Sequence, residues 1–112
     1  MNQERALADY ITDVPDFPQE GILFRDITTL LSDAEGLRQA VDAMVALAQE
    51  MGAEAIAGME SRGFLFGVPI AYALNLPFVT VRKAGKLPRA TVAQSYDLEY
   101  GQATLEVHMD AV

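Results

Sequence analysis

Hydrophobic residues recur with helical spacing near the start of the chain. Between residues 4 and 14 apolar side chains lie three or four positions apart, which predicts an amphipathic helix. These side chains are Leu7, Tyr10, Ile11 and Val14. Pro15 and Pro18 follow, and because proline cannot continue a helix, the predicted helix ends before them.

A longer helical stripe begins after Ser32. Ser32 and Glu35 have the spacing of a capping box, which predicts a helix start. Gly52 stands where a helix commonly ends in a glycine cap. The apolar positions between them are Leu37, Ala40, Val41, Met44, Val45, Ala48 and Met51. This segment is therefore predicted to be one amphipathic helix.

Shorter apolar runs on either side of this helix predict strands. Gly21–Thr29 is typical of a turn followed by a short extended piece, and Ala53–Met59 of a buried strand. A helix over Gly63–Leu74 and a strand over Pro77–Arg82 are expected next, with a turn at Asn75 between them. The order of strand, helix and strand indicates a parallel α/β sheet.

The last part of the chain has a different pattern. Thr91–Tyr100 and Gln102–Asp110 predict an antiparallel hairpin around Gly101, and the second arm alternates apolar and polar residues. The predicted fold class is α/β, with a parallel sheet, flanking helices and an antiparallel hairpin. Parallel sheets usually have five or six strands, so we expect further strands after Val112. We expect one C-terminally truncated domain, with an N-terminal region over 1–32, an α/β core over 33–90 and a hairpin over 91–112.

Composition narrows the function classes. The chain lacks cysteine and has one histidine, His108, so a thiolate or multi-histidine metal site is not expected, and His108 is assigned no role. A net charge of -8 disfavours binding to nucleic acid or anionic membrane. The absence of a long apolar run or a signal-peptide pattern predicts a soluble cytoplasmic protein.

The charges are unevenly distributed. No acidic residue occurs from Ser61 to Tyr96, whereas five of the eight basic residues lie there. They are Arg62, Arg82, Lys83, Lys86 and Arg89. A positive segment in an acidic protein favours binding of a small anion, although chance clustering on a solvated loop is the alternative.

Two cationic loops follow the two predicted parallel strands. In the first, Gly58 and Gly63 flank Arg62 at the start of a helix, where free N–H groups and a guanidinium suit phosphate. The alternative is an ordinary turn in which Arg62 pairs with Glu60. The second loop is Arg82–Arg89, for which a dimer-contact or solubility role is the alternative. Because parallel strands end at the same edge of a sheet, we expect both loops to meet in one anion-binding crevice.

Other candidate residues lie outside these loops. Asp97 and Glu99 are the only acids expected near the basic segment, and a carboxylate at a loop tip is a candidate for proton transfer or an ordinary solvated side chain. Phe24 lies in the short extended piece, where an aromatic ring either stacks on a flat ligand or fills the core.

Four strings in this order and spacing, GILFRDIT, ESRGFLFG, RKAGKLPR and SYDLEYG, resemble adenine phosphoribosyltransferases of the type I phosphoribosyltransferase fold. The resemblance runs from about Val14 to Val112 and corresponds to the N-terminal portion of the family. It implies transfer of a 5-phosphoribosyl group from phosphoribosyl pyrophosphate to adenine, giving AMP and pyrophosphate. Mg2+ would be bound through phosphoribosyl pyrophosphate, and a homodimer is the implied assembly.

The resemblance also implies roles for individual residues. Leu23, Phe24 and Arg25 would form the adenine pocket, which makes residues 1–32 the base-binding region. A cis peptide is implied at Glu60-Ser61. Pyrophosphate would be bound by Ser61, Arg62, Arg82, Lys83 and Lys86. In the mobile loop of residues 89–100, Glu99 would exchange a proton with the purine and Tyr100 would help to close the site.

The family's most diagnostic motif, of the type VVDDLLATGGT, has no match in these 112 residues. This loop binds the ribose 5-phosphate, and it should begin shortly after Val112. We therefore expect the chain alone not to complete the reaction. Two other hypotheses remain: a non-catalytic module that binds purine or pyrophosphate, and a phosphoribosyltransferase specific for another purine such as xanthine.

Overall fold

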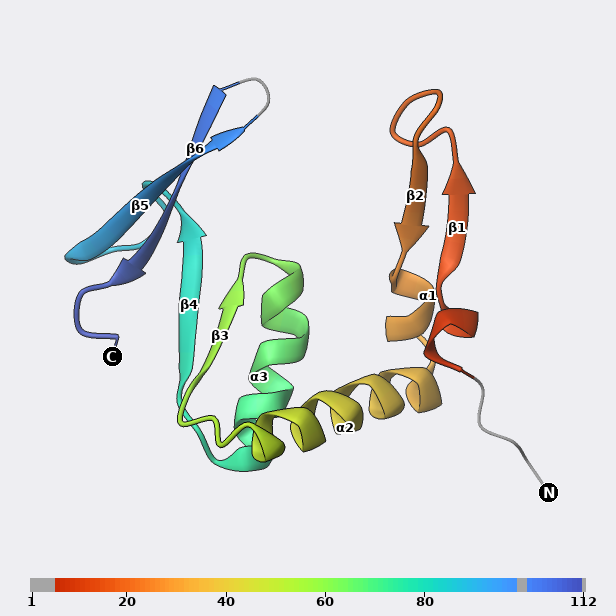
Figure 1. Cartoon of the computed structure of the whole chain (residues 1–112), viewed down its shortest axis with the longest axis horizontal. Helices are drawn as coiled ribbons and strands as arrows, with labels where there is room; N and C mark the ends of the chain where they lie inside the picture. The colour runs from red at the N-terminus through yellow and green to blue at the C-terminus, as the bar shows by residue number, and fades with distance from the viewer. Residues whose placement is uncertain (1–5, 99–100, 112) are drawn as a thin grey trace. The chain divides into compact units, whose positions relative to one another are not determined.

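The structure is a computed structural model, and it describes residues 6–98 and 101–111. The chain divides into two compact units, Met1–Met44 and Val45–Val112, and the boundary between them in the sequence falls within the long helix α2, Ala34–Glu50 (Figure 1). The predicted division into regions 1–32, 33–90 and 91–112 stays a prediction.

The first unit begins with a short 3-10 helix, η1 (Leu7–Tyr10), and two antiparallel strands, β1 (Thr12–Pro15) and β2 (Leu23–Asp26). The helix predicted over residues 4–14 is therefore wrong in its second half. Thr12–Pro15 is extended because it forms a ladder with β2, in which Val14 stands opposite Phe24. The apolar spacing of this segment is compatible with a helix, and pairing with a distant strand overrides it.

Helix α1 (Thr28–Leu31) separates β2 from α2 and changes the role of Ser32. The Ser32 hydroxyl donates to the Thr28 carbonyl at 2.9 Å and so belongs to the end of α1. Asp33 caps α2 instead, since its carboxylate accepts the N–H of Gly36 at 2.9 Å. The predicted capping box is wrong by one residue because a short helix precedes the long one.

The C-terminal cap of α2 is confirmed. Gly52 has a φ of +70°, and its N–H donates to the Gln49 carbonyl at 3.1 Å. The N–H of Ala53 donates to the Ala48 carbonyl at 3.0 Å, which completes a Schellman motif. Glycine adopts this left-handed conformation without the steric cost of a Cβ.

The second unit is built on a mixed sheet of four strands in the order β3-β4-β6-β5 (Figure 1). Strands β3 (Ile56–Met59) and β4 (Phe78–Lys83) are parallel and are joined by α3 (Arg62–Leu74). Strands β5 (Thr91–Leu98) and β6 (Gly101–His108) form the predicted hairpin. β6 also pairs antiparallel with β4, so the hairpin extends the parallel pair. The α/β fold class is confirmed.

Glycines allow α3 to lie close to one face of this sheet. A Cβ at Gly67 would stand 2.3 Å from Cε1 of Phe78, and one at Gly58 would stand 2.6 Å from the Gly63 carbonyl oxygen. Phe64 meets Phe78 edge to face with ring centroids 5.8 Å apart. Ile70 and Ala71 of α3 belong to the small buried core.

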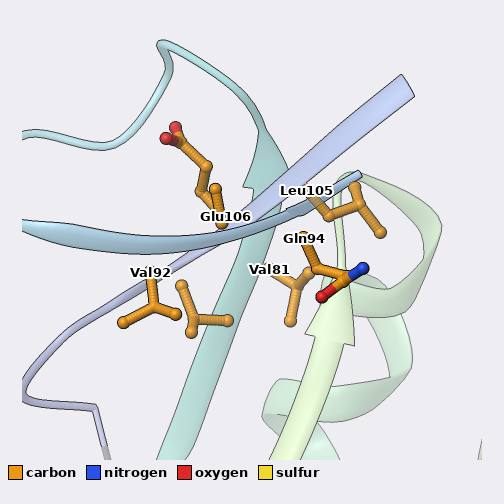
Figure 2. Close-up of a pocket in the computed structure, with 7 residues that line it drawn as sticks. Val81, Val92, Gln94, Leu105 and Glu106 are labelled. Atoms are coloured by element: carbon orange, nitrogen blue, oxygen red, sulfur yellow. The ribbon is translucent and has the colours of Figure 1, made fainter. Parts of the chain in front are cut away.

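The opposite face of the sheet is largely uncovered in the described part of the chain. Met59 and Val92 on this face are 58% and 55% exposed, respectively. A shallow apolar depression of about 240 Å³ lies here, and Figure 2 shows Val81, Val92 and Leu105 around it, with the Glu106 carboxylate directed to the other side. The predicted alternation of burial along β6 is not seen, because its residues 103–108 are all partly buried.

Candidate functional site

The two cationic loops begin at neighbouring strand ends. The N–H of Glu60, just after β3, donates to the Val81 carbonyl of β4 at 3.0 Å. The Glu60-Ser61 peptide is cis, as the resemblance implies. Ser61 occupies the N-cap position of α3 without a side-chain cap, and Arg62 is the first helical residue. The chain thus turns directly from β3 into the N-terminus of α3.

Glu60 brings two of the predicted pyrophosphate-binding cations together. Its carboxylate accepts a hydrogen bond from Nε of Arg82 and lies 3.3 Å from Nζ of Lys86. Arg82 in turn donates to the carbonyl of Lys86 at 3.2 Å. The three residues form a closed ring of contacts, which we call the Glu60 ring. The two loops therefore meet, as predicted.

The charges of the ring perturb its carboxyl group. The hydrogen bond from Arg82, together with the contact with Lys86, holds the pKa of Glu60 below its usual value despite partial burial. The Glu60 side chain is 23% exposed, compared with 33% for Arg82 and 50% for Lys86. Lys86 is thus the more exposed of the two cations.

The second cationic loop opens with a tight turn at the end of β4. The N–H of Lys86 donates to the Lys83 carbonyl at 3.3 Å, and Gly85 has a φ of +86° as in a type II turn. Lys83 is exposed at the last position of the strand. The Glu106 carboxylate accepts from the N–H of Gly85 at 2.8 Å and from the hydroxyl of Thr91 at 3.0 Å. Glu106 thereby ties the turn to the start of β5.

Residues at and just after the end of β6 contact the second part of the segment between β4 and β5. Asp110 pairs with Arg89 at 2.7 Å, and Nε2 of His108 lies 2.9 Å from the Pro88 carbonyl. The Arg89 guanidinium lowers the pKa of Asp110. The expectation that Asp97 and Glu99 are the only acids near the basic segment is therefore wrong. In the sequence, the polar residues at alternate positions of β6 were the available signal for acids near the basic segment. Their partners could not be predicted, because these depend on the pairing of β6 with β4 and β5.

The predicted adenine-binding residues lie in the first unit. Leu23, Phe24 and Arg25 are consecutive on β2. The Phe24 ring meets the Phe17 ring edge to face at 5.1 Å, whereas Leu23 is 50% exposed. Arg25 lies 3.6 Å from the carboxylate of its cross-strand partner Asp13.

The turn between β1 and β2 encloses a small depression. The N–H of Gly21 donates to the Asp16 side chain at 2.9 Å, and Gly21 has a φ of +87°. The depression has a volume of about 170 Å³. It is lined by Pro15, Asp16, Gly21, Ile22 and Leu23.

The predicted catalytic residue, Glu99, and the predicted closing residue, Tyr100, lie outside the described residues. In the described residues the pairing of β5 with β6 runs up to Leu98 opposite Gly101. Asp97, next to Leu98, accepts a hydrogen bond from the Gln102 amide at 3.0 Å. No cluster of three or more His, Cys, Asp or Glu suited to a metal occurs in the part of the chain that the structure describes. None of the described helices has the length and apolarity needed to cross a membrane.

Parallel strands that end in cationic turns beside a helix N-terminus are an arrangement in which α/β domains commonly bind phosphate groups. No protein-family model matches the chain. An adenine phosphoribosyltransferase of Agathobacter rectalis is 56% identical over 108 residues, which are 96% of this chain and 62% of that protein. The chain spans about 60% of the length of the curated relatives it matches.

Solved structures of adenine phosphoribosyltransferases resemble the chain as well. The adenine phosphoribosyltransferase of Rhodothermus marinus has a TM-score of 0.83 at 49% identity, covering 95% of this chain and 60% of that one. The Saccharomyces cerevisiae enzyme, complexed with adenine and an imino-altritol bisphosphate, has a TM-score of 0.86 at 38% identity, covering 95% and 62%. The chain is therefore similar in sequence and in fold to adenine phosphoribosyltransferases over the part of them that it covers.

Proposed function

We propose that this chain provides the adenine-binding and pyrophosphate-binding parts of an adenine phosphoribosyltransferase, an enzyme of purine salvage. The complete reaction transfers a 5-phosphoribosyl group from phosphoribosyl pyrophosphate to adenine and releases AMP and pyrophosphate. The observation that carries the proposal is the gathering of Arg82 and Lys86 at Glu60, beside the N-terminus of α3, in a chain 56% identical to such an enzyme.

Pyrophosphate would bind where β3 turns into α3. The first N–H groups of a helix have no partner within the helix, and together they form a partial positive charge that favours phosphate oxygens. Ser61 and Arg62 stand at this terminus. Lys83 and Lys86 are the first and last residues of the adjacent turn, and the Lys86 ammonium beside Glu60 would neutralise part of the charge that develops on the departing pyrophosphate.

Mg2+ would enter with phosphoribosyl pyrophosphate as part of the substrate. Phosphate oxygens are ligands that Mg2+ prefers, and it keeps several waters in such sites. The residues proposed to bind pyrophosphate are cationic or hydroxylic, which fits a metal held by the substrate better than one held by protein carboxylates. The bound ion would reduce the negative charge that these cations must balance.

Adenine would bind against β2. In the described part of the chain β2 pairs with β1 alone, so its other edge offers backbone donors and acceptors to the edge of a purine. The Phe24 ring would pack on the flat face of the base. The adenine complex of the related yeast enzyme supports the choice of this base.

Residues 99 and 100 complete the proposal. As the bond from C1 of the ribose to pyrophosphate breaks and the bond to the purine nitrogen forms, the nitrogen loses a proton. Glu99 would take this proton, and Tyr100 would help to exclude water from the oxocarbenium-like state. A cytoplasmic location and a homodimeric assembly are part of the same proposal.

Selectivity between purines tests this function. Calorimetric titration of the chain with adenine, hypoxanthine and xanthine should give binding to adenine and at least tenfold weaker binding to the two oxopurines, because a site that pairs with the 6-amino group leaves its own groups unpaired when that amino group is absent. A preference for xanthine would contradict the proposal and support a xanthine-type transferase.

A further inference from the structure

The Glu60 ring joins the two cationic loops through contacts of different kinds. Arg82 is held by two of them, one to the Glu60 carboxylate and one to the Lys86 carbonyl. The backbone of Lys86 is fixed at both its N–H and its C=O, by Lys83 and Arg82 respectively. The flexible Lys86 side chain joins the ring through its ion pair with Glu60, so it can leave the ring without disturbing the turn.

A negative charge in this place acts against an incoming anion. The Glu60 carboxylate lies 3.3 Å from the Lys86 ammonium, so it offsets part of the positive charge that a pyrophosphate would meet. Like charges a few ångströms apart repel each other even at the dielectric constant of water. Pyrophosphate carries several negative charges, so the effect of one carboxylate on it is multiplied.

We propose that Glu60 is a positioning residue that serves as the built-in counter-anion of the pyrophosphate site. It keeps Arg82 and Lys86 together before the ligand arrives, and Lys86 then exchanges the carboxylate for a pyrophosphate oxygen. Arg82 stays on Glu60 and acts as a strut between β3 and the turn. This inference rests on the proposed function, and it adds that Glu60 weakens pyrophosphate binding and so favours release of this product.

The direction in which one substitution changes the affinity for pyrophosphate tests the inference. Glu60→Gln removes the charge but keeps an oxygen that can accept the Arg82 hydrogen bond. Calorimetric titration with inorganic pyrophosphate in Mg2+ should show about three- to tenfold tighter binding to Glu60→Gln than to the wild-type chain. The gain should shrink at high salt, since ions screen exposed charges. Simple damage to the site would weaken binding instead.

Two further variants separate charge at this position from other effects. Asp110→Asn makes the same change in net charge, but it removes the ion-pair partner of Arg89. Arg89 is not assigned to the pyrophosphate site. The Asp110→Asn variant should therefore bind pyrophosphate with the affinity of the wild type. Glu60→Asp keeps the charge on a shorter side chain and should never bind more tightly than the wild type. Far-ultraviolet circular dichroism verifies that each variant is folded. If Glu60→Gln does not fold, Glu60→Asp remains the test, because tighter pyrophosphate binding by this charged variant overturns the inference.

The outcomes are distinct. Tighter binding by Glu60→Gln alone supports the inference. Equal or weaker binding by a folded Glu60→Gln, or equal tightening by Asp110→Asn or Glu60→Asp, overturns it while the proposed function stands. Failure of both the wild type and Glu60→Gln to bind pyrophosphate overturns the proposed pyrophosphate site and the inference with it.

Discussion

Glu106 on β6 accepts a hydrogen bond from the backbone N–H of Gly85 at 2.8 Å, and its other oxygen accepts from Thr91 at 3.0 Å. One carboxylate thus connects the turn that carries Lys83 and Lys86 to the first residue of the hairpin β5–β6. The proposed catalytic residue, Glu99, follows β5 directly in the sequence and lies outside the described residues. The Glu106 side chain therefore holds both the conformation of the cationic turn and that of the start of β5.

Replacement of this carboxylate should loosen the turn. In Glu106→Ala the N–H of Gly85 loses its acceptor, so we expect faster amide hydrogen exchange at Gly85, measured by nuclear magnetic resonance. A partially exposed hydrogen bond to a charged group contributes about 1.5 to 3 kcal/mol at most, which limits the increase to about 10- to 150-fold. Thr91→Val, which removes only the other contact, should leave exchange at Gly85 nearly unchanged. Unchanged exchange in Glu106→Ala would mean that the turn is held by its own backbone.

The ion pairs of Glu60 and Asp110 should make stability depend on acid pH. In the folded chain both carboxyl groups have lowered pKa values, because Arg82 and Arg89 stabilise their charged forms. A lowered folded-state pKa gives stability that is present above the unfolded-state pKa and is lost as pH falls through the folded-state value. Chemical unfolding should therefore show a free energy that is constant near neutral pH and falls below about pH 5.

Substitutions show which carboxyl groups cause this pH dependence of the free energy of unfolding. The double substitution Glu60→Gln with Asp110→Asn should flatten the fall in the free energy of unfolding at acid pH, whereas Glu50→Gln, at an exposed helix end, should leave the slope unchanged. A slope that is equally steep in the double variant would assign the acid sensitivity to other carboxyl groups.

The close approach of α3 to the sheet should make Gly67 intolerant of a methyl group. Alanine is normally better than glycine in a helix by about 1 kcal/mol. Here the added Cβ would stand 2.3 Å from the Phe78 ring, and overpacking of this kind costs about 1 to 3 kcal/mol. We expect Gly67→Ala to lower the free energy of unfolding by up to about 2 kcal/mol in a urea titration. Val68→Ala, at the next and half-exposed position, should cost less. Stabilisation by Gly67→Ala would show that the helix can move away from Phe78.

Local patterns predicted the second unit well. The strand–helix–strand order of residues 56–83, the turn at Asn75 and the hairpin around Gly101 all follow from short-range signals such as apolar runs and glycine positions. The same signals failed at Thr12–Pro15, whose conformation depends on pairing with β2. They also placed the cap of α2 one residue early, at Ser32 instead of Asp33, because the four-residue helix α1 has no strong sequence signature.

The candidate site shows the same limit. The sequence identified the cations Arg82 and Lys86, but it paired Glu60 with Arg62 in one alternative and gave Glu106 no role. The contacts of Glu60 with Arg82 and of Glu106 with Gly85 join residues more than 20 positions apart in the chain. Their existence depends on the register of β3, β4 and β6, and no local pattern encodes that register.

In the proposed function, different residues of this chain bind adenine and pyrophosphate. The most direct measurement is calorimetric titration of each ligand, with Mg2+ present, into the wild type, Phe24→Ala and Arg62→Gln. Phe24→Ala should weaken adenine binding by about 1 kcal/mol or more through lost stacking, and leave pyrophosphate binding unchanged. Arg62→Gln should weaken pyrophosphate binding at least tenfold through loss of a charge-assisted contact, and leave adenine binding unchanged. Loss of both ligands in both variants, or binding of neither ligand by the wild type, would contradict the account.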